Sequence, residues 1–403
     1  MDGPSLRGHR TGPESRTAEL GNTRRVTAGT QQRDSSADGL LAPVLEAADL
    51  GRLRGAVETA LRSFLTEQRE TLATMAAELV PVADEVAAVA GGGKRLRPAF
   101  AYWGWRAFVD ATDPAAEPDE AVLRAVAALE LVHSSALVHD DVMDAALTRR
   151  GRAATHVGFA DRHDGDSLDG DPATFGVGAA ILVGDLALVW SDELLRRSGI
   201  SPAALARARP VWDTMRTEVT AGQYLDLLRA AGGLPGPAGA LAVARYKSAG
   251  YTVQRPLQLG ASLAAAGPDA LEVCTAIGLP LGEAFQLRDD VLGVFGDPAV
   301  TGKSADDDLR EGKRTLLVAL TEEAADGDGR ALLAGALGNS DADGDQLDEV
   351  RSLMTRTGAL DRVEERIAAQ TRAARRAIAD APLAADACRA LDALAVAATS
   401  RAA

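Results

Sequence analysis

Residues 137–144 read Leu-Val-His-Asp-Asp-Val-Met-Asp, so three carboxylates close an otherwise apolar segment. The apolar and small residues before them recur at the spacing of one helical face, at Val122, Val126, Leu129, His133 and Ala136. On a helix, Asp140 and Asp144 lie one turn apart, at about 6 Å. Like charges at this spacing destabilise an isolated helix, and carboxylate oxygens suit Mg²⁺. A solvated helix end is the plainer alternative, which the buried character of the preceding stripe weakens.

Basic residues follow this motif at Thr148-Arg149-Arg150-Gly151-Arg152. A guanidinium group matches the geometry of a phosphate. Carboxylates for a metal beside arginines for phosphate are the two halves of a diphosphate site. Favourable placement of cations at a helix C-terminus explains one arginine better than three.

A second acidic segment lies about 150 residues later, at Glu283–Gly293, with the sequence EAFQLRDDVLG. It again places a carboxylate pair, Asp289 and Asp290, at the end of an apolar helical pattern. Two such helices that face one another could hold a metal cluster between them.

Three other loops have residues that could bind phosphate or metal. Neither GGGKRLRP at residues 91–98 nor Gly296–Ser304 has the Walker spacing, but both offer exposed backbone and lysine to a phosphate. The acidic loop 338–348 lacks the glycine and the final glutamate of a calcium loop, because Gln346 and Ser352 stand there. We interpret it as a solvated loop.

Composition predicts an all-α protein. Hydrophobic residues make up 46% of the 403 residues and aromatics only 4%, and the formal charge is −15. Such an acidic chain is a poor general ligand for nucleic acid or anionic membrane. We expect a disordered tail over residues 1–40 and one helical domain over 41–403. Helical periodicity is clearest in Leu53–Leu79, Val122–Val142, Ile181–Leu195, Leu271–Val294 and Leu316–Leu320.

The two cysteines, Cys274 and Cys388, are far apart and belong to no paired motif. We expect buried thiols in a reducing compartment. No run of eighteen apolar residues and no hydrophobic signal core occurs, which predicts a cytoplasmic protein without stable membrane insertion.

The ordered motifs resemble the trans-prenyl diphosphate synthases of the polyprenyl synthetase family, and most closely their bacterial geranylgeranyl-type members. The resemblance spans about Gly91 to Leu317. It rests on GGKRLRP, HDDVMD with RRGR, GQYLD at Gly222–Asp226, Lys247, FQLRDD, and GKSADDDLREGKRT at Gly302–Thr315. It implies a single large helical bundle of the isoprenoid synthase type with a central active-site cavity. It also implies Mg²⁺ as cofactor, isopentenyl and allylic diphosphates as substrates, and a homodimer.

The same resemblance implies a role for each matching residue. The catalytic set is Asp140, Asp141, Asp144, Arg149, Lys247, Asp289 and Asp290. Within it, Asp140, Asp144 and Asp289 would bind Mg²⁺. Isopentenyl diphosphate would be held by Lys94, Arg97, His133 and Arg150. The allylic diphosphate would be held by Arg149, Lys247, Gln286, Lys303 and Lys313, with Gln223 and Asp226 near the metal site or the forming cation.

Two positions depart from the family pattern. Ser248 follows the lysine where a threonine is usual, and Gly293 stands where many members have a third aspartate in the second motif. We still expect activity, since in the family that motif acts mainly through its first aspartate.

Product length is predicted from the helix beneath Asp140. A helical turn rises about 5.4 Å, close to one extended isoprene unit. One turn down lie the small residues Ser135 and Ala136, and Val132 lies one turn further. In the family, a bulky aromatic near these positions tends to stop growth at fifteen carbons. Its absence predicts a twenty-carbon product, geranylgeranyl diphosphate, with farnesyl or longer-chain products as alternatives.

Two other classes rank lower. A terpene cyclase normally has an Asn-led second metal motif, whereas Asn22 and Asn339 lie in no such context. A non-catalytic subunit of a heteromeric synthase should have lost some charged site residues, and here both aspartate pairs and the lysines remain.

Overall fold

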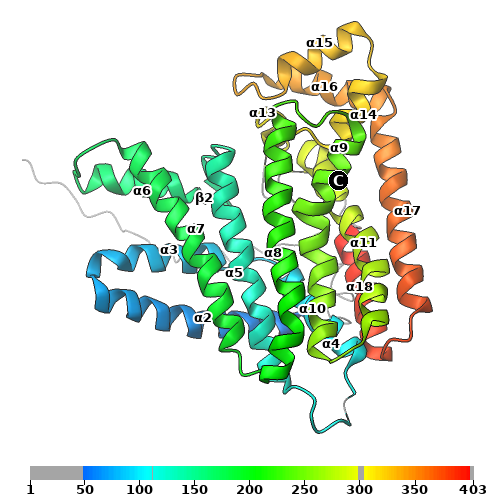
Figure 1. Ribbon diagram of the computed structural model, residues 1–403. Helices are drawn as coiled ribbons and strands as arrows, with labels where there is room; N and C mark the ends of the chain where they lie inside the picture. The colour runs from blue at the N-terminus through cyan, green and yellow to red at the C-terminus, as the bar shows by residue number, and fades with distance from the viewer. Residues whose placement is uncertain (1–48, 111, 298–303, 400–403) are drawn as a thin grey trace, which may run out of the picture. The chain divides into compact units, whose positions relative to one another are not determined.

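Alanine- and leucine-rich segments form long helices, which dominate the regular structure of the protein (Figure 1). The computed structural model describes residues 49–110, 112–297 and 304–399, all within one unit bounded by Ser36 and Ala403. In these residues the only strands are two two-residue segments that pair Thr148 with Ala153 and Arg149 with Arg152. The all-α prediction is confirmed.

The helices of the N-terminal half, with the strands, are α2 (Leu50–Met75), the 3₁₀ turn η1 (Ala77–Leu79), α3 (Val80–Ala90), α4 (Leu96–Phe108), α5 (Asp119–Met143), β1 (Thr148–Arg149), β2 (Arg152–Ala153), α6 (Thr155–Gly165) and α7 (Pro172–Arg196). Those of the C-terminal half are α8 (Pro202–Ala230), α9 (Gly236–Val243), the π-helix η2 (Ala244–Gln254), α10 (Arg255–Leu263), α11 (Pro268–Phe295), α13 (Asp307–Arg310), α14 (Leu316–Ala324), α15 (Gly327–Ala336), α16 (Gly344–Arg356), α17 (Ala359–Asp380) and α18 (Ala385–Thr399).

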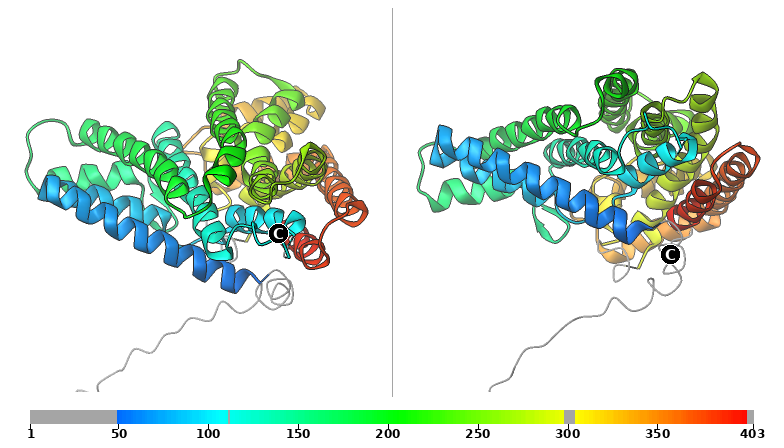
Figure 2. Two further views of the ribbon diagram at one scale, coloured as in Figure 1. Left: turned by 60° about the horizontal axis from the view of Figure 1, so that its bottom comes forward. Right: turned by 90° about the horizontal axis from the view of Figure 1, so that it is seen from below.

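Helix α5 is the centre of the larger hydrophobic core. Its predicted apolar stripe is fully buried at Val122 and Val126, and Leu129 is 1% exposed. The helix packs against α2, α4 and α7, while α2 and α3 fold back on one another as a hairpin (Figure 2). Its first turn carries Asp119 and Glu120, whose negative charges suit a helix N-terminus.

Helix α11 joins this core to a second one. Its first half contributes Cys274, Ile277 and Leu281 to the core around α5, and its second half contributes Leu287 and Val291 to a cluster with α13–α17. The second acidic motif therefore stands on a helix that is packed along its length.

The prediction that both cysteines are buried is only partly met. Cys274 is buried, but Cys388 is only half-buried. By length and composition, α5 and α7 could each cross a membrane, although a core helix passes the same test. The apolar window of α5 is 78% buried and that of α7 only 33%, so α7 has an apolar face exposed in this chain.

The predicted tail, residues 1–40, lies outside the described residues. The domain division stays a prediction.

Candidate active site

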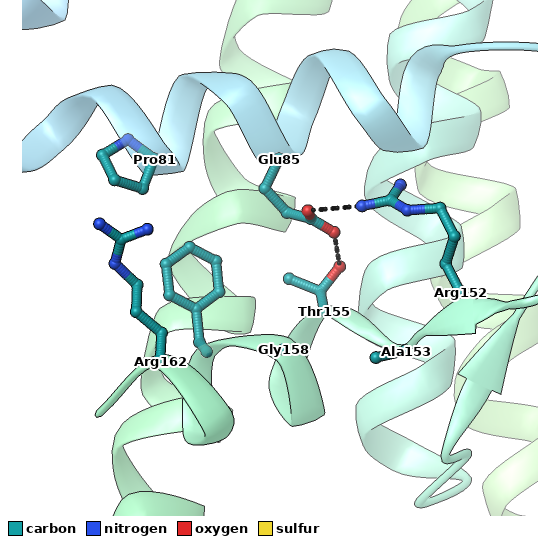
Figure 3. Close-up of a pocket in the computed structure, with 8 residues that line it drawn as sticks. Pro81, Glu85, Arg152, Ala153, Thr155, Gly158 and Arg162 are labelled. Atoms are coloured by element: carbon teal, nitrogen blue, oxygen red, sulfur yellow. Dashed lines mark hydrogen bonds and ion pairs between the residues drawn. The ribbon is translucent and has the colours of Figure 1, made fainter. Parts of the chain in front are cut away.

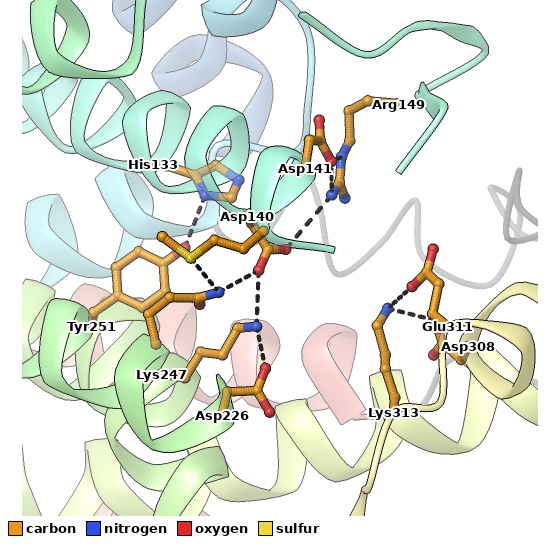
Figure 4. A network of polar contacts seen from close by, with 12 residues as sticks. His133, Asp140, Asp141, Arg149, Asp226, Lys247, Tyr251, Asp308, Glu311 and Lys313 are labelled. Carbon is orange, nitrogen blue, oxygen red and sulfur yellow. Dashed lines mark hydrogen bonds and ion pairs between the residues drawn. The ribbon is translucent and has the colours of Figure 1, made fainter. Parts of the chain in front are cut away.

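The first acidic motif meets two other segments at the C-terminal end of α5 (Figure 4). Asp140 Oδ1 accepts hydrogen bonds from Lys247 Nζ at 2.9 Å and from Gln223 Nε2 at 2.8 Å. Lys247 Nζ also donates to Asp226 Oδ2 at 2.6 Å. Four residues that the sequence places in three separate motifs thus form one network.

The position of Lys247 depends on close packing between α8 and η2. A β-carbon on Gly222 of α8 would lie 2.6 Å from Lys247 Cα and 2.5 Å from the carbonyl carbon of Tyr246. Only glycine allows this approach, which sets Lys247 beside Gln223 and Asp226. An extended π-helix is rare, and π turns occur frequently at functional sites.

Charge in this network differs from one carboxylate to the next. Burial alone would raise the pKa of Asp140, but Lys247 and the hydrogen bond from Gln223 bring it below its ordinary value. Burial and the neighbouring charge of Asp140 raise the pKa of Asp144 to about 6. The negative charge of Asp140 is therefore balanced by Lys247. The charge of Asp144 is balanced less well, and its carboxyl is more easily protonated.

Arg149 reaches this group from β1. Its Nε donates to Asp141 Oδ1 at 2.8 Å, and a second nitrogen, Nη2, bonds the same oxygen. The guanidinium also lies 3.7 Å from Asp140 Oδ2. Asp141 is buried and faces the arginine, so its role is to hold Arg149 at the edge of the motif.

A second, basic group surrounds His133, which lies two turns before Asp140 on α5, and includes Arg97 of α4 and Tyr251 of η2. His133 Nδ1 shares a 2.8 Å hydrogen bond with the Tyr251 hydroxyl, and Arg97 Nη2 donates to the same hydroxyl at 2.6 Å. Arg97 also donates to Thr252 Oγ1 at 3.1 Å. Since arginine only donates, the tyrosine hydrogen is available to Nδ1, which favours His133 as a neutral ring with a proton on Nε2.

The electrostatics agree with a neutral His133. Burial and the charges of Arg97, Arg150 and Arg149 hold its pKa well below the ordinary range. Several arginines around a neutral hydrogen-bond donor form an environment that suits a phosphate group.

The three cations of residues 94–97 have different surroundings. Lys94 is exposed, whereas Arg95 is buried and donates to Glu130 Oε2 at 2.6 Å and to the Ala90 carbonyl at 2.8 Å. Removing one partner of a buried pair of this kind costs roughly 3–5 kcal/mol. Arg95 is therefore structural, whereas Arg97 belongs to the group around Tyr251.

The arginines of the β1–β2 hairpin also divide. Arg150 Nη1 donates to the Gly91 carbonyl at 3.0 Å, beside the glycine loop. Arg152 turns the other way, to Glu85 of α3 at 3.1 Å, and Thr155 donates to the same carboxylate at 2.9 Å (Figure 3). Glu85 thus ties the hairpin to α3, in a surface hollow apart from the acidic motifs.

The second acidic motif is more negative than the first. Gln286 Nε2 donates to Asp290 Oδ1 at 2.7 Å, yet burial and the charges of Asp289 and Asp308 raise the pKa of Asp290 to about 7. Asp289 is exposed at the end of the helix. Lys313, whose charge acts on Asp290, is bonded to Asp308 and Glu311 instead.

Lys313 lies between the two motifs. Its Nζ is 2.6 Å from Asp308 Oδ1 and 3.0 Å from Glu311 Oε2 (Figure 4). Its charge lowers the pKa of both Asp144 and Asp290 against the larger effect of burial. The two acidic helices therefore share one electrostatic environment.

The carboxylates of the two motifs are of the kind that bind a divalent cation, but they are not close enough together to share one ion. In the described part of the chain, no group of three or more His, Cys, Asp or Glu side chains is arranged to hold one ion. Asp144, Asp289 and Asp290 nevertheless offer carboxylate oxygens, the hard ligands that suit Mg²⁺. Burial and like charge raise the pKa of Asp144 and Asp290, and a bound cation would offset that like charge.

The remaining predicted residues lie as follows. Val132 and Ser135 are buried, and Ala136 is half-buried on the face of Asp140, one turn below it. Ser248 is half-buried in η2. Lys303 lies outside the described residues.

Sequence reasoning missed Tyr251, Thr252, Asp308 and Glu311. Tyr251 lies four residues after Lys247, but a π-helix changes which residues share a face. The acidic run before Lys313 was a visible signal for the other two.

Comparison with known proteins agrees with this geometry. Residues 82–354 match the polyprenyl synthetase family model. The chain is 34% identical over 278 residues to geranylfarnesyl diphosphate synthase of Aeropyrum pernix, covering 69% of this chain and 80% of that protein. It is also 34% identical over 265 residues to the (2E,6E)-farnesyl diphosphate synthase of Mycobacterium tuberculosis, covering 65% and 67%.

A solved structure is similar across nearly the whole fold. The geranylgeranyl pyrophosphate synthase from Corynebacterium glutamicum, complexed with isoprenyl diphosphate and magnesium, has a TM-score of 0.84 and 38% identity, over 88% of this chain and 99% of that one. The chain belongs to the polyprenyl synthetase family and is an all-α trans-prenyltransferase.

Proposed function

We propose that the protein condenses isopentenyl diphosphate with an allylic diphosphate and releases geranylgeranyl diphosphate. The observation that carries this proposal is that two sites of opposite character meet α5, one around Asp140 and the other around His133. A carboxylate site around Asp140 and Asp144 would take Mg²⁺ and the allylic diphosphate. The basic site around Arg97, His133 and Arg150 would take isopentenyl diphosphate.

Each group has a task in the condensation. Asp140, Asp144 and Asp289 would hold Mg²⁺, which would supply positive charge to the leaving diphosphate. Lys247 and Arg149 donate hydrogen bonds to that diphosphate, which offsets the charge that develops as the allylic C–O bond breaks. A new C–C bond forms to the homoallylic double bond, and the carbon next to it loses a proton to the released diphosphate. The side chains therefore need to orient and neutralise, and no separate base is required.

The product length rests on the wall beneath Asp140. The small side chain of Ala136, one turn below Asp140, would leave space for a growing tail, and Val132 continues the same direction as a modest aliphatic side chain. This space favours growth beyond fifteen carbons.

Product analysis tests both the proposed substrates and the proposed product length. We would incubate the protein with isopentenyl diphosphate, Mg²⁺ and each allylic starter, and size the products by chromatography. A twenty-carbon product is expected. Fifteen- or twenty-five-carbon products would contradict the length assignment alone, and no elongation with any starter would contradict the proposed substrates. Ala136→Phe should shorten the product, whereas Ala128→Phe, two turns further down, should shorten it less.

We also propose that the chain acts as a cytoplasmic homodimer through α7. This helix exposes Phe175, Ile181, Leu182 and Val189, at 43–62% of their surface. An apolar face of this kind on a soluble protein marks an interaction site. Light scattering should report a dimer for the wild type, and Leu182→Glu should shift it towards monomer. A monomeric wild type would contradict the proposal.

A further inference from the structure

The two acidic motifs of this chain, DDVMD and DDVLG, differ in charge at their last position. Each begins with an Asp-Asp pair, and four residues after the first aspartate one has Asp144 and the other has Gly293. Residues four apart on a helix project from the same face. Gly293 therefore marks the place on α11 where a third carboxylate would stand beside Asp289.

A carboxylate from another segment fills this place. A β-carbon on Gly293 would overlap Asp308 Oδ2 and lie 2.7 Å from Asp308 Cγ. Asp308 belongs to α13, fifteen residues further along the chain. Its charge also acts on Asp290, which shows that it faces the second motif.

Asp308 is held firmly in this position. Its neighbour Leu309 is 1% exposed and anchors α13 in the core with α11. Lys313 bonds Oδ1 at 2.6 Å, and the Lys313 amide donates to the Asp308 carbonyl at 3.0 Å. Oδ2 is the oxygen that points towards Gly293.

We infer that Asp308 supplies the third carboxylate of the second acidic motif, and that Gly293 is small in order to admit it. The carboxylate adds negative charge beside Asp289, where the proposed function places a divalent cation with a diphosphate. The inference rests on that proposed function. The competing explanation is that Asp308 serves only as the salt-bridge partner of Lys313.

Relocating the carboxylate separates these explanations. We would measure Mn²⁺ binding to the full chain by electron paramagnetic resonance in the presence of inorganic pyrophosphate. Asp308→Asn preserves size and removes the charge, and we expect about 10- to 100-fold weaker Mn²⁺ binding. In the double variant Gly293→Asp/Asp308→Ala, the carboxylate returns on α11, and binding should recover to within about threefold of wild type, a non-additive result.

Three further variants complete the design. Gly293→Asp alone should weaken binding, because two side chains compete for one place. Asp307→Asn removes an adjacent exposed carboxylate and should bind Mn²⁺ like the wild type. Without pyrophosphate, Lys313→Ala should not weaken Mn²⁺ binding, since it removes a cation that competes for Asp308. Melting temperatures and circular dichroism of each variant check that it is folded.

Wild-type affinity in Asp308→Asn would overturn the inference, as would a double variant that binds Mn²⁺ no better than Asp308→Asn. So would a Lys313→Ala variant that, without pyrophosphate, binds Mn²⁺ as weakly as Asp308→Asn. Asp289→Asn distinguishes a failure of the proposed cation site from a failure of the role inferred for Asp308. Unchanged binding in Asp289→Asn would contradict the proposed cation site itself, whereas weakened binding there with unchanged Asp308→Asn would contradict only the role of Asp308.

Discussion

The two acidic motifs begin alike in sequence but differ in the charges around them. In the first, Lys247 and Gln223 bond Asp140 and lower its pKa below the ordinary value. In the second, Asp290 is half-buried near Asp289 and Asp308, and its pKa rises to about 7. The charge of Asp140 is thus already balanced by the protein, while Asp290 lies among like charges that an added cation would offset. Neighbours from other segments create this difference.

The largest expected effect comes from the first aspartate of each motif. Asp140→Asn should reduce kcat/KM on the order of 10²–10³-fold, because it removes charge where the leaving diphosphate is neutralised. Asp289→Asn should approach this loss, and Asp290→Asn should cost less than about tenfold. Steady-state kinetics with isopentenyl and allylic diphosphates measure all three. A loss in Asp290→Asn equal to that in Asp140→Asn would show that the motifs are used alike.

Gly222→Ala should disturb only the first motif. The added methyl group collides with the backbone at Lys247, and a shift of about 1 Å in a positioned group can cost on the order of 100-fold in rate. Gly55→Ala is the matched control, because it lies within helix α2 with no atom within 4 Å of the added carbon. Equal activity of both variants would remove the packing explanation for the position of Lys247.

Lys247→Ala should change two affinities in opposite directions. Loss of its charged hydrogen bond should weaken pyrophosphate binding about 10- to 100-fold in the presence of Mg²⁺. Without pyrophosphate, Mn²⁺ should bind more tightly, because no ammonium group competes for Asp140 Oδ1. Isothermal titration calorimetry measures both quantities. Weaker Mn²⁺ binding in the variant would mean that Lys247 orients Asp140 instead of competing for it.

The smallest effect concerns stability and pH. The raised pKa of Asp290, about 7, means that the folded protein binds a proton that the unfolded chain releases above about 4. Stability of the metal-free protein should therefore rise as pH falls from 8 towards 5. Asp290→Asn should raise the Tm by about 2–4 °C at pH 8, and this gain should shrink as pH falls through 7 and disappear only at about pH 4. Asp144→Asn should show the same trend over a narrower window, since its pKa is about 6.

Differential scanning fluorimetry across this pH range in the presence of a chelator provides the measurement. An Asp290→Asn variant that is less stable than wild type at pH 8 would show that its charge is compensated in the fold.

Much of the fold followed from local pattern. The stripe from Val122 to Leu129 predicted a buried helix because helical periodicity survives in any environment that covers one face. The aspartates at its end predicted a cation site for the same reason, since residues 140 and 144 share a face whatever surrounds them.

The contacts around the basic residues could not be predicted from the sequence. Tyr251 escaped notice because it lies in a π-helix, where the usual spacing rules do not apply. Arg95 and Arg97 look equivalent in sequence, yet one is paired with buried Glu130 and the other reaches Tyr251. Which cation meets a ligand depends on the segments packed beside it.

By itself, the sequence determined the helical class, the two acidic motifs and the family, because these depend on residue type and on spacing within one segment. Only the tertiary structure decided that Lys247 neutralises Asp140, that Arg152 ties a hairpin to α3, and that Asp308 lies against Gly293. Those contacts join residues 15 to more than 100 positions apart. They depend on how closely two backbones approach, which glycines such as Gly222 permit and which no spacing along one helix encodes.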